Sequence, residues 1–197
     1  MYVKSKRERK RRLVIKNYIY NVIYQILTLV LPLITTPYIS RVIGADGIGS
    51  YSFTQSIVSY FALFGVVGLN VYGQREIAYY QNDKKKRSEI FKELISIRVI
   101  TVGISMLVYL FFVMSCQDEY KILYYIQCVT LVEAMIDISW FFQGMEDFKK
   151  VLYRNLIVKL ITTVGIFLIV KEKTDLYIYV LLLVRGNFFG YASMWLY

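Results

Sequence analysis

The sequence from residue 95 to residue 114 reads ISIRVITVGISMLVYLFFVM, and this stretch decides the fold class of the chain. One charged side chain, Arg98, lies among residues that are otherwise apolar or small and uncharged. A bilayer core about 30 Å thick is crossed by a helix of about 20 such residues. A helix also satisfies its own backbone N–H and C=O groups, as the lipid interior requires. The stretch therefore predicts a membrane-spanning helix.

Apolar stretches of the same kind recur on both sides of it. The chain has 197 residues, 57% of them hydrophobic, and a mean hydropathy of +0.46, which is above the usual range of a soluble domain. We predict an all-α integral membrane protein with a bundle of about six transmembrane helices. A basic cytoplasmic tail at 1–12 precedes the bundle at 13–197. The approximate spans are 13–40, 48–72, 90–114, 122–142, 151–170 and 176–197.

The net charge of +10 is unevenly distributed along the chain. Lysines and arginines gather before the first span, between the second and third spans, and between the fourth and fifth, where Lys149, Lys150 and Arg154 lie. The positive-inside rule then predicts a cytoplasmic N-terminus and cytoplasmic even-numbered loops. The longest loop contains QNDKKKRSE at 81–89, which we expect to contact anionic membrane lipids. Nucleic acid is not an expected partner.

Several chemistries are disfavoured by the composition. The chain has no histidine, which excludes imidazole metal sites and Ser-His or Cys-His catalysis. Cys116 and Cys128 show no metal-binding spacing and no disulfide framework. We therefore predict no catalytic residues, no metal and no cofactor. The stretch GADGIG at 44–49 lacks the Lys-Ser/Thr of a phosphate-binding loop, and it predicts a tight turn in which Asp46 caps the next helix.

Polar residues of the first span share one helical face, because they recur every three or four positions. Lipid satisfies none of these groups, so the face is predicted either to line a hydrated cavity or to pack against other helices. The residues predicted as a polar cavity wall are Asn17, Asn21, Gln25 and Thr28.

Charged residues inside the spans are the strongest functional signal, since a charge near the bilayer centre costs about 2.5–3.5 kcal/mol. Arg98 and Arg185 suit bidentate binding of a phosphate or diphosphate, and Lys159 either joins them or extends to the cytoplasmic surface. Glu133 and Asp137 lie four residues apart on one helical face. They are predicted to face the bundle interior, where they serve either ion or proton coupling or charge balance through a salt bridge to Arg98.

Three stretches resemble one protein family: YNVIYQILTLVLPLITTPYISRVIGADGIGSYSF at 20–53, GLNVYGQREIA at 68–78 and DISWFFQGMEDF at 137–148. They are similar to the Wzx-type oligosaccharide flippases, which handle O-antigen or capsule repeat units. These flippases belong to the polysaccharide-transport branch of the multidrug/oligosaccharidyl-lipid/polysaccharide exporter superfamily. The resemblance implies two helical bundles around a cationic cavity in the bacterial inner membrane, with this chain as the N-terminal half.

The same resemblance implies the substrate and the partners. The substrate class is an undecaprenyl-diphosphate-linked oligosaccharide, moved from the cytoplasmic to the outer leaflet for capsule, O-antigen or exopolysaccharide synthesis. Polysaccharide polymerase and chain-length machinery are the implied protein partners. Two alternatives stay open, a drug or metabolite antiporter of the same superfamily and a truncated, non-functional flippase remnant. A membrane enzyme is disfavoured because the predicted outer loops are short.

Overall fold

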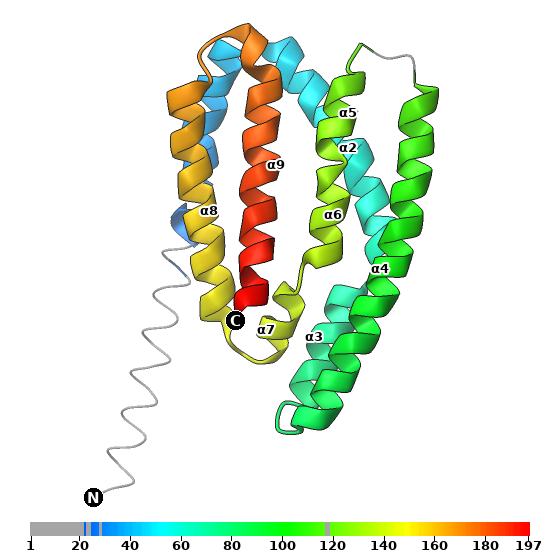
Figure 1. The fold of residues 1–197 in the computed structure, drawn as a ribbon. Coiled ribbons are helices and arrows are strands. Elements are labelled where there is room, and N and C mark those ends of the chain that lie inside the picture. Colours follow the sequence, from blue (N-terminus) through cyan, green and yellow to red (C-terminus); the bar gives the residue numbers. More distant parts are fainter. Residues whose placement is uncertain (1–21, 23–24, 28, 117–118) are drawn as a thin grey trace, which may run out of the picture. The chain divides into compact units, whose positions relative to one another are not determined.

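The computed structural model describes residues 22, 25–27, 29–116 and 119–197, in which every regular element is a helix (Figure 1). The chain divides into two compact units, Met1–Tyr38 and Ile39–Tyr197. The described residues of the first unit are helical, and Gln25–Val42 is long and apolar enough to cross a membrane. The second unit contains α2 (Ala45–Val66), α3 (Leu69–Tyr79), α4 (Lys84–Ser115), α5 (Lys121–Gln127), α6 (Val129–Ile136), α7 (Ser139–Gly144), α8 (Phe148–Ile169), η1 (Lys173–Asp175), α9 (Leu176–Ser193) and η2 (Met194–Leu196).

The number of candidate membrane spans agrees with the sequence. Five helices of the described residues are long and apolar enough to cross a membrane, and α2 with α3, bent by 42° at their junction, makes a sixth if the pair is one span. The segment Lys121–Gly144 is a single candidate span composed of α5, α6 and α7. The predicted all-α membrane fold is therefore confirmed.

The turn before α2 is set by a glycine. Gly44 has φ of +87°, a conformation that favours glycine, and it is the N-cap residue of α2. The prediction that Asp46 caps this helix is wrong, because the cap carries no side-chain hydrogen bond. Asp46 lies inside the first turn, past the cap position, where its charge interacts favourably with the helix dipole.

The junction of α2 and α3 bends because two consecutive residues leave the right-handed helical region. Val67 has φ of +47° and Gly68 has φ of +74°. Glycine adopts this conformation at little cost, whereas a β-branched residue such as Val67 is strained there. The junction therefore holds a sharp bend at a point where the sequence has no proline.

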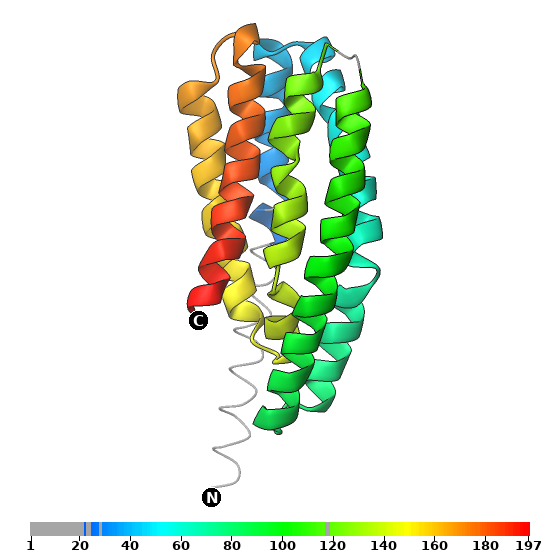
Figure 2. The same cartoon turned by 45° about the vertical axis from the view of Figure 1, so that its right-hand side comes forward.

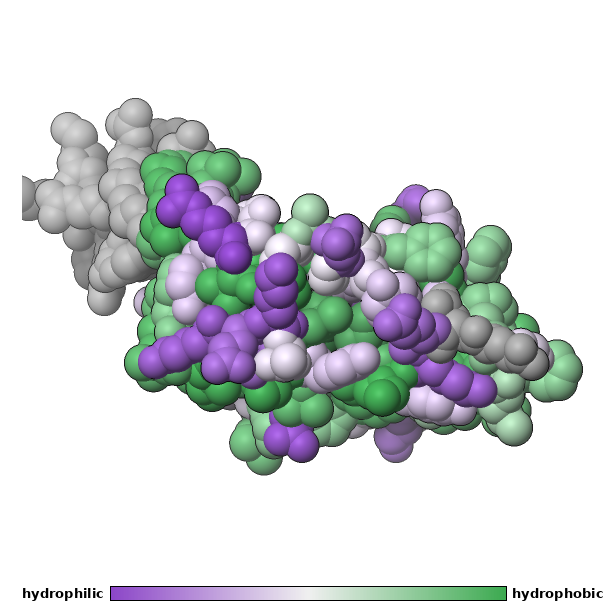
Figure 3. Space-filling view, turned by 90° about the horizontal axis from the view of Figure 1, so that it is seen from above, coloured by the Kyte–Doolittle hydropathy of each residue, from purple (hydrophilic) through white to green (hydrophobic). Residues whose placement is uncertain are grey.

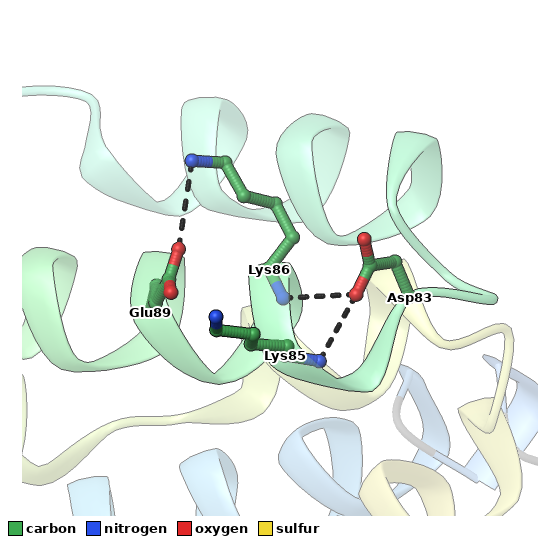
Figure 4. A network of polar contacts seen from close by, with 4 residues as sticks. All are labelled: Asp83, Lys85, Lys86 and Glu89. Atoms are coloured by element: carbon green, nitrogen blue, oxygen red, sulfur yellow. Dashed lines mark hydrogen bonds and ion pairs between the residues drawn. The ribbon is translucent and has the colours of Figure 1, made fainter.

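The N-terminus of α4 is capped by Asp83, as Figure 4 shows. Its Oδ1 accepts hydrogen bonds from the backbone N–H groups of Lys85 and Lys86, at 3.0 and 3.1 Å. The Lys86 ammonium also pairs with Glu89 at 3.6 Å, an exposed contact that contributes little stability. The cap lets a long membrane helix begin directly at a run of basic residues.

The core of the second unit is organised around α4. Figures 1 and 2 both show α2 beside one part of α4 and α3 beside the other, in agreement with the contacts between these helices. A Cβ atom built on Gly65 of α2 would lie 3.0 Å from the Cα of Val102, so this glycine sets how closely the two helices approach. Buried residues recur on α4 every three or four positions: Ile90, Leu94, Arg98, Val102, Ser105, Tyr109 and Val113.

The connections of the second unit lie at two opposite ends of its helices (Figure 1). The end with the α3–α4 turn and the start of α8 carries Lys84–Lys86, Lys149 and Lys150. The opposite end carries the connection from α8 to α9, where Lys171, Glu172 and Lys173 are exposed. Figure 3, viewed from that second end, shows hydrophilic side chains scattered among apolar ones.

Candidate functional site: a broken span and a buried charged cluster

The span Lys121–Gly144 is interrupted at Asp137. Helix α6 ends at Ile136, Asp137 is extended (φ −68°, ψ 108°), and α7 begins at Ser139. The Oδ1 atom of Asp137 accepts a hydrogen bond from the backbone N–H of Ser139 at 2.9 Å. The carboxylate therefore serves one of the N–H groups that the start of a helix leaves unpaired.

Arg98 closes this break from the side of α4. Its side chain is 1% exposed. Nη1 donates to the backbone carbonyl oxygen of Asp137, and Nη2 donates to Oδ1 of Asn70 on α3. The guanidinium carbon also lies 5.9 Å from the centre of the Trp140 ring. Arg98 thus joins α3, α4 and the break, and its contact with residue 137 is to the backbone carbonyl.

A second freed carbonyl at the end of α6 is satisfied from another element. Nε1 of Trp195, on η2, donates to the carbonyl oxygen of Ile136 at 2.8 Å. Unpaired backbone groups are costly in lipid, so non-helical backbone at membrane depth needs partners of this kind. Both carbonyls freed by the interruption thus have side-chain donors, so the fold stabilises the break.

Helices α3 and α7 approach closely because glycines lie at their contact. A Cβ atom on Gly73 would lie 2.5 Å from the ring of Trp140. A Cβ atom on Gly144 would lie 2.7 Å from the carbonyl oxygen of Gln74 and 2.8 Å from Cβ of Ile77. Two of the stretches that carry the family resemblance, 68–78 and 137–148, thus pack against each other.

Glu133 is the buried acid of the cluster. Its side chain on α6 is 5% exposed, and its Oε1 has no hydrogen-bond partner among the residues that the structure describes. It interacts electrostatically with Arg154 on α8. The Arg154 guanidinium lies 4.2 Å from the ring centre of Tyr191 on α9, and its Nη2 donates to Oδ1 of Asn155. Nε and Nη1 of Arg154 have no partner within the described part of the chain.

Arg154 was missed as a site residue because hydropathy placed the fifth span at 151–170 and left this arginine at its edge. Helix α8 begins at Phe148, so Arg154 lies in its second turn. The sequence signal was available, since an arginine one position before Asn155 on a membrane helix needs a polar partner.

The other predicted cations lie on α8 and α9, which pack against each other. Arg185 is exposed near the midpoint of α9, and Lys159 is half-buried on α8. A Cβ atom on Gly186 would lie 2.4 Å from the hydroxyl oxygen of Thr162, so the helices touch there. Lys159 and Arg185 are each within one turn of this contact point, whereas Arg98 is engaged elsewhere.

The predicted polar wall falls mostly outside the described residues. Asn17, Asn21 and Thr28 are not among them, and Gln25 is exposed. No group of three or more metal-ligating side chains occurs within the described ranges. Cys116 and Cys128 are free thiols.

The fold and the long apolar helices define a multi-pass helical membrane protein. The family described as "Polysaccharide biosynthesis protein" matches residues 14–197, and the chain belongs to this family.

Two relatives carry the name "Putative O-antigen transporter". The protein from Escherichia coli (strain K12) is 28% identical over 164 residues, which cover 82% of this chain and 39% of that protein. The protein from Shigella dysenteriae is 25% identical over 150 residues, 74% of this chain and 37% of that protein. The chain thus spans well under half the length of these curated relatives. No solved structure matches the chain.

Proposed function

We propose that the chain forms one helical bundle of a Wzx-type flippase that moves undecaprenyl-diphosphate-linked oligosaccharide repeat units across the bacterial inner membrane. Capsule, O-antigen or exopolysaccharide synthesis is the process it serves. The family membership and the names of the relatives support a transport role and not an enzymatic one. In this proposal the N-terminus is cytoplasmic, and polysaccharide polymerase and chain-length machinery are the protein partners.

The observation that carries the proposal is the exposure of Arg185. It lies near the midpoint of α9, flanked by the buried Val184, and its side chain is exposed on the surface of the second unit. A charge facing hydrocarbon at that depth costs about 2.5–3.5 kcal/mol, so water or another protein surface must cover this face. A cavity wall shared with a second bundle meets that requirement.

A second cation lies at a similar depth on the neighbouring helix. Lys159 approaches from α8 at the depth where Gly186 and Thr162 bring the two helices together. Two cations on adjacent helices suit a diphosphate, which carries several negative oxygens. We propose that Arg185 and Lys159 attract the diphosphate of the substrate. The predicted binding of the diphosphate by Arg98 is not part of this proposal, because its guanidinium is buried and donates to protein acceptors.

Helix α2 contributes a polar face that supports a hydrated cavity. Ser52, Ser56 and Ser59 are exposed, and Gln55 is half-buried beside them, so the four share one side of the helix. The hydroxyls of Ser56 and Ser59 bond to backbone carbonyls one turn earlier, both at 2.7 Å. The Gln55 amide nitrogen donates to the Ser59 hydroxyl at 3.4 Å, a long contact, and its polar atoms are better satisfied by water than by lipid.

Glu133 is our candidate for coupling transport to a proton or cation, with Arg154 as its charge balance. Asp137 is committed to the start of α7, whereas Glu133 keeps a buried oxygen without a partner among the described residues. Glu133→Gln at the chromosomal locus is expected to abolish the pH or sodium dependence of export. Asp137→Asn, which keeps an oxygen to accept the hydrogen bond from Ser139, is the matched control. Unchanged dependence in Glu133→Gln together with lower thermal stability would contradict the coupling role.

The transport proposal is tested in cells by Arg185→Ala introduced at the chromosomal locus. The expected result is reduced surface polysaccharide and accumulation of lipid-linked repeat units, with normal amounts of the protein in the membrane. Lys171→Ala removes an exposed cation at the end of the same helical pair and serves as control. Normal export in an Arg185→Ala, Lys159→Ala double variant would refute the proposed role of these two cations.

A further inference from the structure

A cavity of about 570 Å³ lies at the end of the second unit where α4 and α8 begin. Two of its walls are helical faces in which lining residues are spaced three, one and three positions apart, as neighbours on one side of a helix are. Side chains of η2 and the start of α8 complete it. The first wall is Lys84, Arg87, Ser88 and Phe91, and the second is Ile138, Phe141, Phe142 and Met145.

The charge of the cavity lining is positive. Lys84, Arg87 and Lys150 line it together with one acid, Asp147, which already pairs with Lys150 at 3.2 Å. Arg87 donates to the carbonyl oxygen of Gln81 at 2.9 Å and to the sulfur of Met145 at 3.2 Å, and both contacts use Nη1. The planar guanidinium also carries Nε and Nη2 donors, whose geometry suits an anion. Lys84 and Arg87 therefore give the cavity cationic groups in excess of its acid.

Most of the remaining lining residues are aromatic. Phe91 stacks on Trp140, with ring centres 5.7 Å apart, and meets Phe141 edge to face at 5.2 Å. Trp195 approaches Phe91 at 6.0 Å. The Arg87 guanidinium lies 5.9 Å from the centre of the Phe141 ring, so a cation and the apolar wall adjoin. The cavity thus combines a polar, positive part with a hydrocarbon-like part.

The position along the membrane helices indicates what such a cavity takes. Lys84 is the first residue of a candidate span, and Lys150 lies in the first turn of another. Aromatic rings and basic side chains together are typical of the membrane–water interface. Basic pockets between membrane helices bind anionic lipid headgroups. Inorganic phosphate has no apolar part to contact the aromatic side chains, whereas a phospholipid has both a phosphate and hydrocarbon chains.

We propose that this cavity binds an anionic phospholipid, with its phosphate at Lys84 and Arg87 and its glycerol and upper acyl chain against the aromatic wall. The site is separate from the face that carries Arg185 and does not depend on the transport proposal. Binding here fastens the start of α4 to α7 and so holds the end of the broken span.

The two tryptophans of the chain provide the measurement. Trp195 lines the cavity and is 47% exposed, whereas Trp140 is 2% exposed and shielded from lipid. The purified full chain is reconstituted into phosphatidylcholine vesicles that contain a minor fraction of phosphatidylglycerol. Either lipid carries brominated acyl chains, which quench nearby indoles. We expect brominated phosphatidylglycerol to quench Trp195 well beyond its share of the lipid, and Trp195→Phe to remove this excess.

Matched variants distinguish lipid binding in the cavity from general electrostatic attraction of lipid to the basic surface. Lys84→Gln with Arg87→Gln removes two cavity cations, and Lys85→Gln with Lys86→Gln removes two cations of the same turn that do not line the cavity. Each cation near an anionic surface is worth about a fivefold change in lipid affinity. The first pair should abolish the excess quenching, and the second pair should retain most of it. Lys84→Glu alone, at an exposed position, provides the same test if the loss of Arg87 impairs folding.

Three results would overturn the proposal. Equal quenching by brominated phosphatidylcholine and phosphatidylglycerol would show that no headgroup is selected. An equal loss in both double variants would assign the effect to diffuse charge. Relief of quenching by inorganic phosphate would identify the site as one for the free anion and not for the lipid.

Discussion

Replacing Arg98 by lysine tests whether this buried cation is a structural clamp. Arg98→Lys keeps the positive charge but removes the fork whose Nη1 and Nη2 reach two acceptors on different elements. One hydrogen bond to a charged group is worth about 1.5–3 kcal/mol, although contacts between membrane helices average nearer about 0.6 kcal/mol. Partial loss of the contact with Trp140 adds about 0.5–1 kcal/mol. We therefore expect Arg98→Lys to lower the free energy of unfolding by about 2 kcal/mol.

The loss is measurable as a shift of the unfolding midpoint. In a chain of this length each kcal/mol moves Tm by about 2–4 °C, so Arg98→Lys should lower Tm by about 4–8 °C. The reporter is Cys128, which is 8% exposed and becomes reactive toward a thiol dye on unfolding, in a Cys116→Ser background. Asn70→Ala should lower Tm by less, because it removes one acceptor only. Arg75→Lys, at an exposed position on α3, should leave Tm unchanged.

The clamp and substrate-binding roles of Arg98 predict opposite patterns. A clamp lowers Tm in Arg98→Lys and in Asn70→Ala, and the two losses are less than additive because the residues share one contact. A substrate-binding role leaves Tm unchanged in both variants while export falls in Arg98→Lys alone. That second pattern would refute the reasoning from the hydrogen bonds.

Three further predictions concern the helix contact, the break and the topology. Gly73→Ala should prevent stable folding or lower Tm strongly, because its Cβ would lie 2.5 Å from an indole carbon of Trp140. The control Gly49→Ala, whose Cβ would have no atom within 4 Å, should be neutral or slightly stabilising. Asp137→Ala should lower the free energy of unfolding by about 1 kcal/mol, because the hydrogen bond from the Ser139 N–H is lost, and Asp137→Asn should not. With native cysteines replaced by serine, a membrane-impermeant thiol reagent applied to intact cells should label Lys171→Cys and not Lys85→Cys; the reverse pattern would invert the topology.

The membrane fold was predictable because its signal is local. A long apolar stretch with few charges is readable residue by residue, and the stretch 95–114 lies within α4. The end of that helix was less predictable, since α4 begins at Lys84 while the predicted span begins at 90. Hydropathy marks the lipid-facing length of a helix, and the cap at Asp83 sets where the helix itself starts.

The interior contacts were not predictable, because they join residues far apart in the sequence. The spacing of Glu133 and Asp137 suggested two equivalent carboxylates on one face. Helix α6 ends at Ile136, between them, so Asp137 accepts a hydrogen bond from the first N–H group of α7 while Glu133 stays buried near Arg154. Neither proline nor glycine marks that interruption. Only the polar character of residue 137 hinted that the backbone there needed partners.

The clamp at Arg98 also has a consequence for biosynthesis. Asn70 precedes Arg98 by 28 residues and Asp137 follows it by 39. When α4 enters the membrane during translation, one acceptor is therefore already made and the other is not. At that stage Asn70 is the only one of the two acceptors of Arg98 that has been synthesised. The second, the carbonyl of Asp137, is made only after the ribosome has passed the end of α6. The order of these residues in the sequence therefore predicts that insertion proceeds in dependent steps, in which the side chain of Arg98 in α4 gains its second protein acceptor only after a later helix has been made.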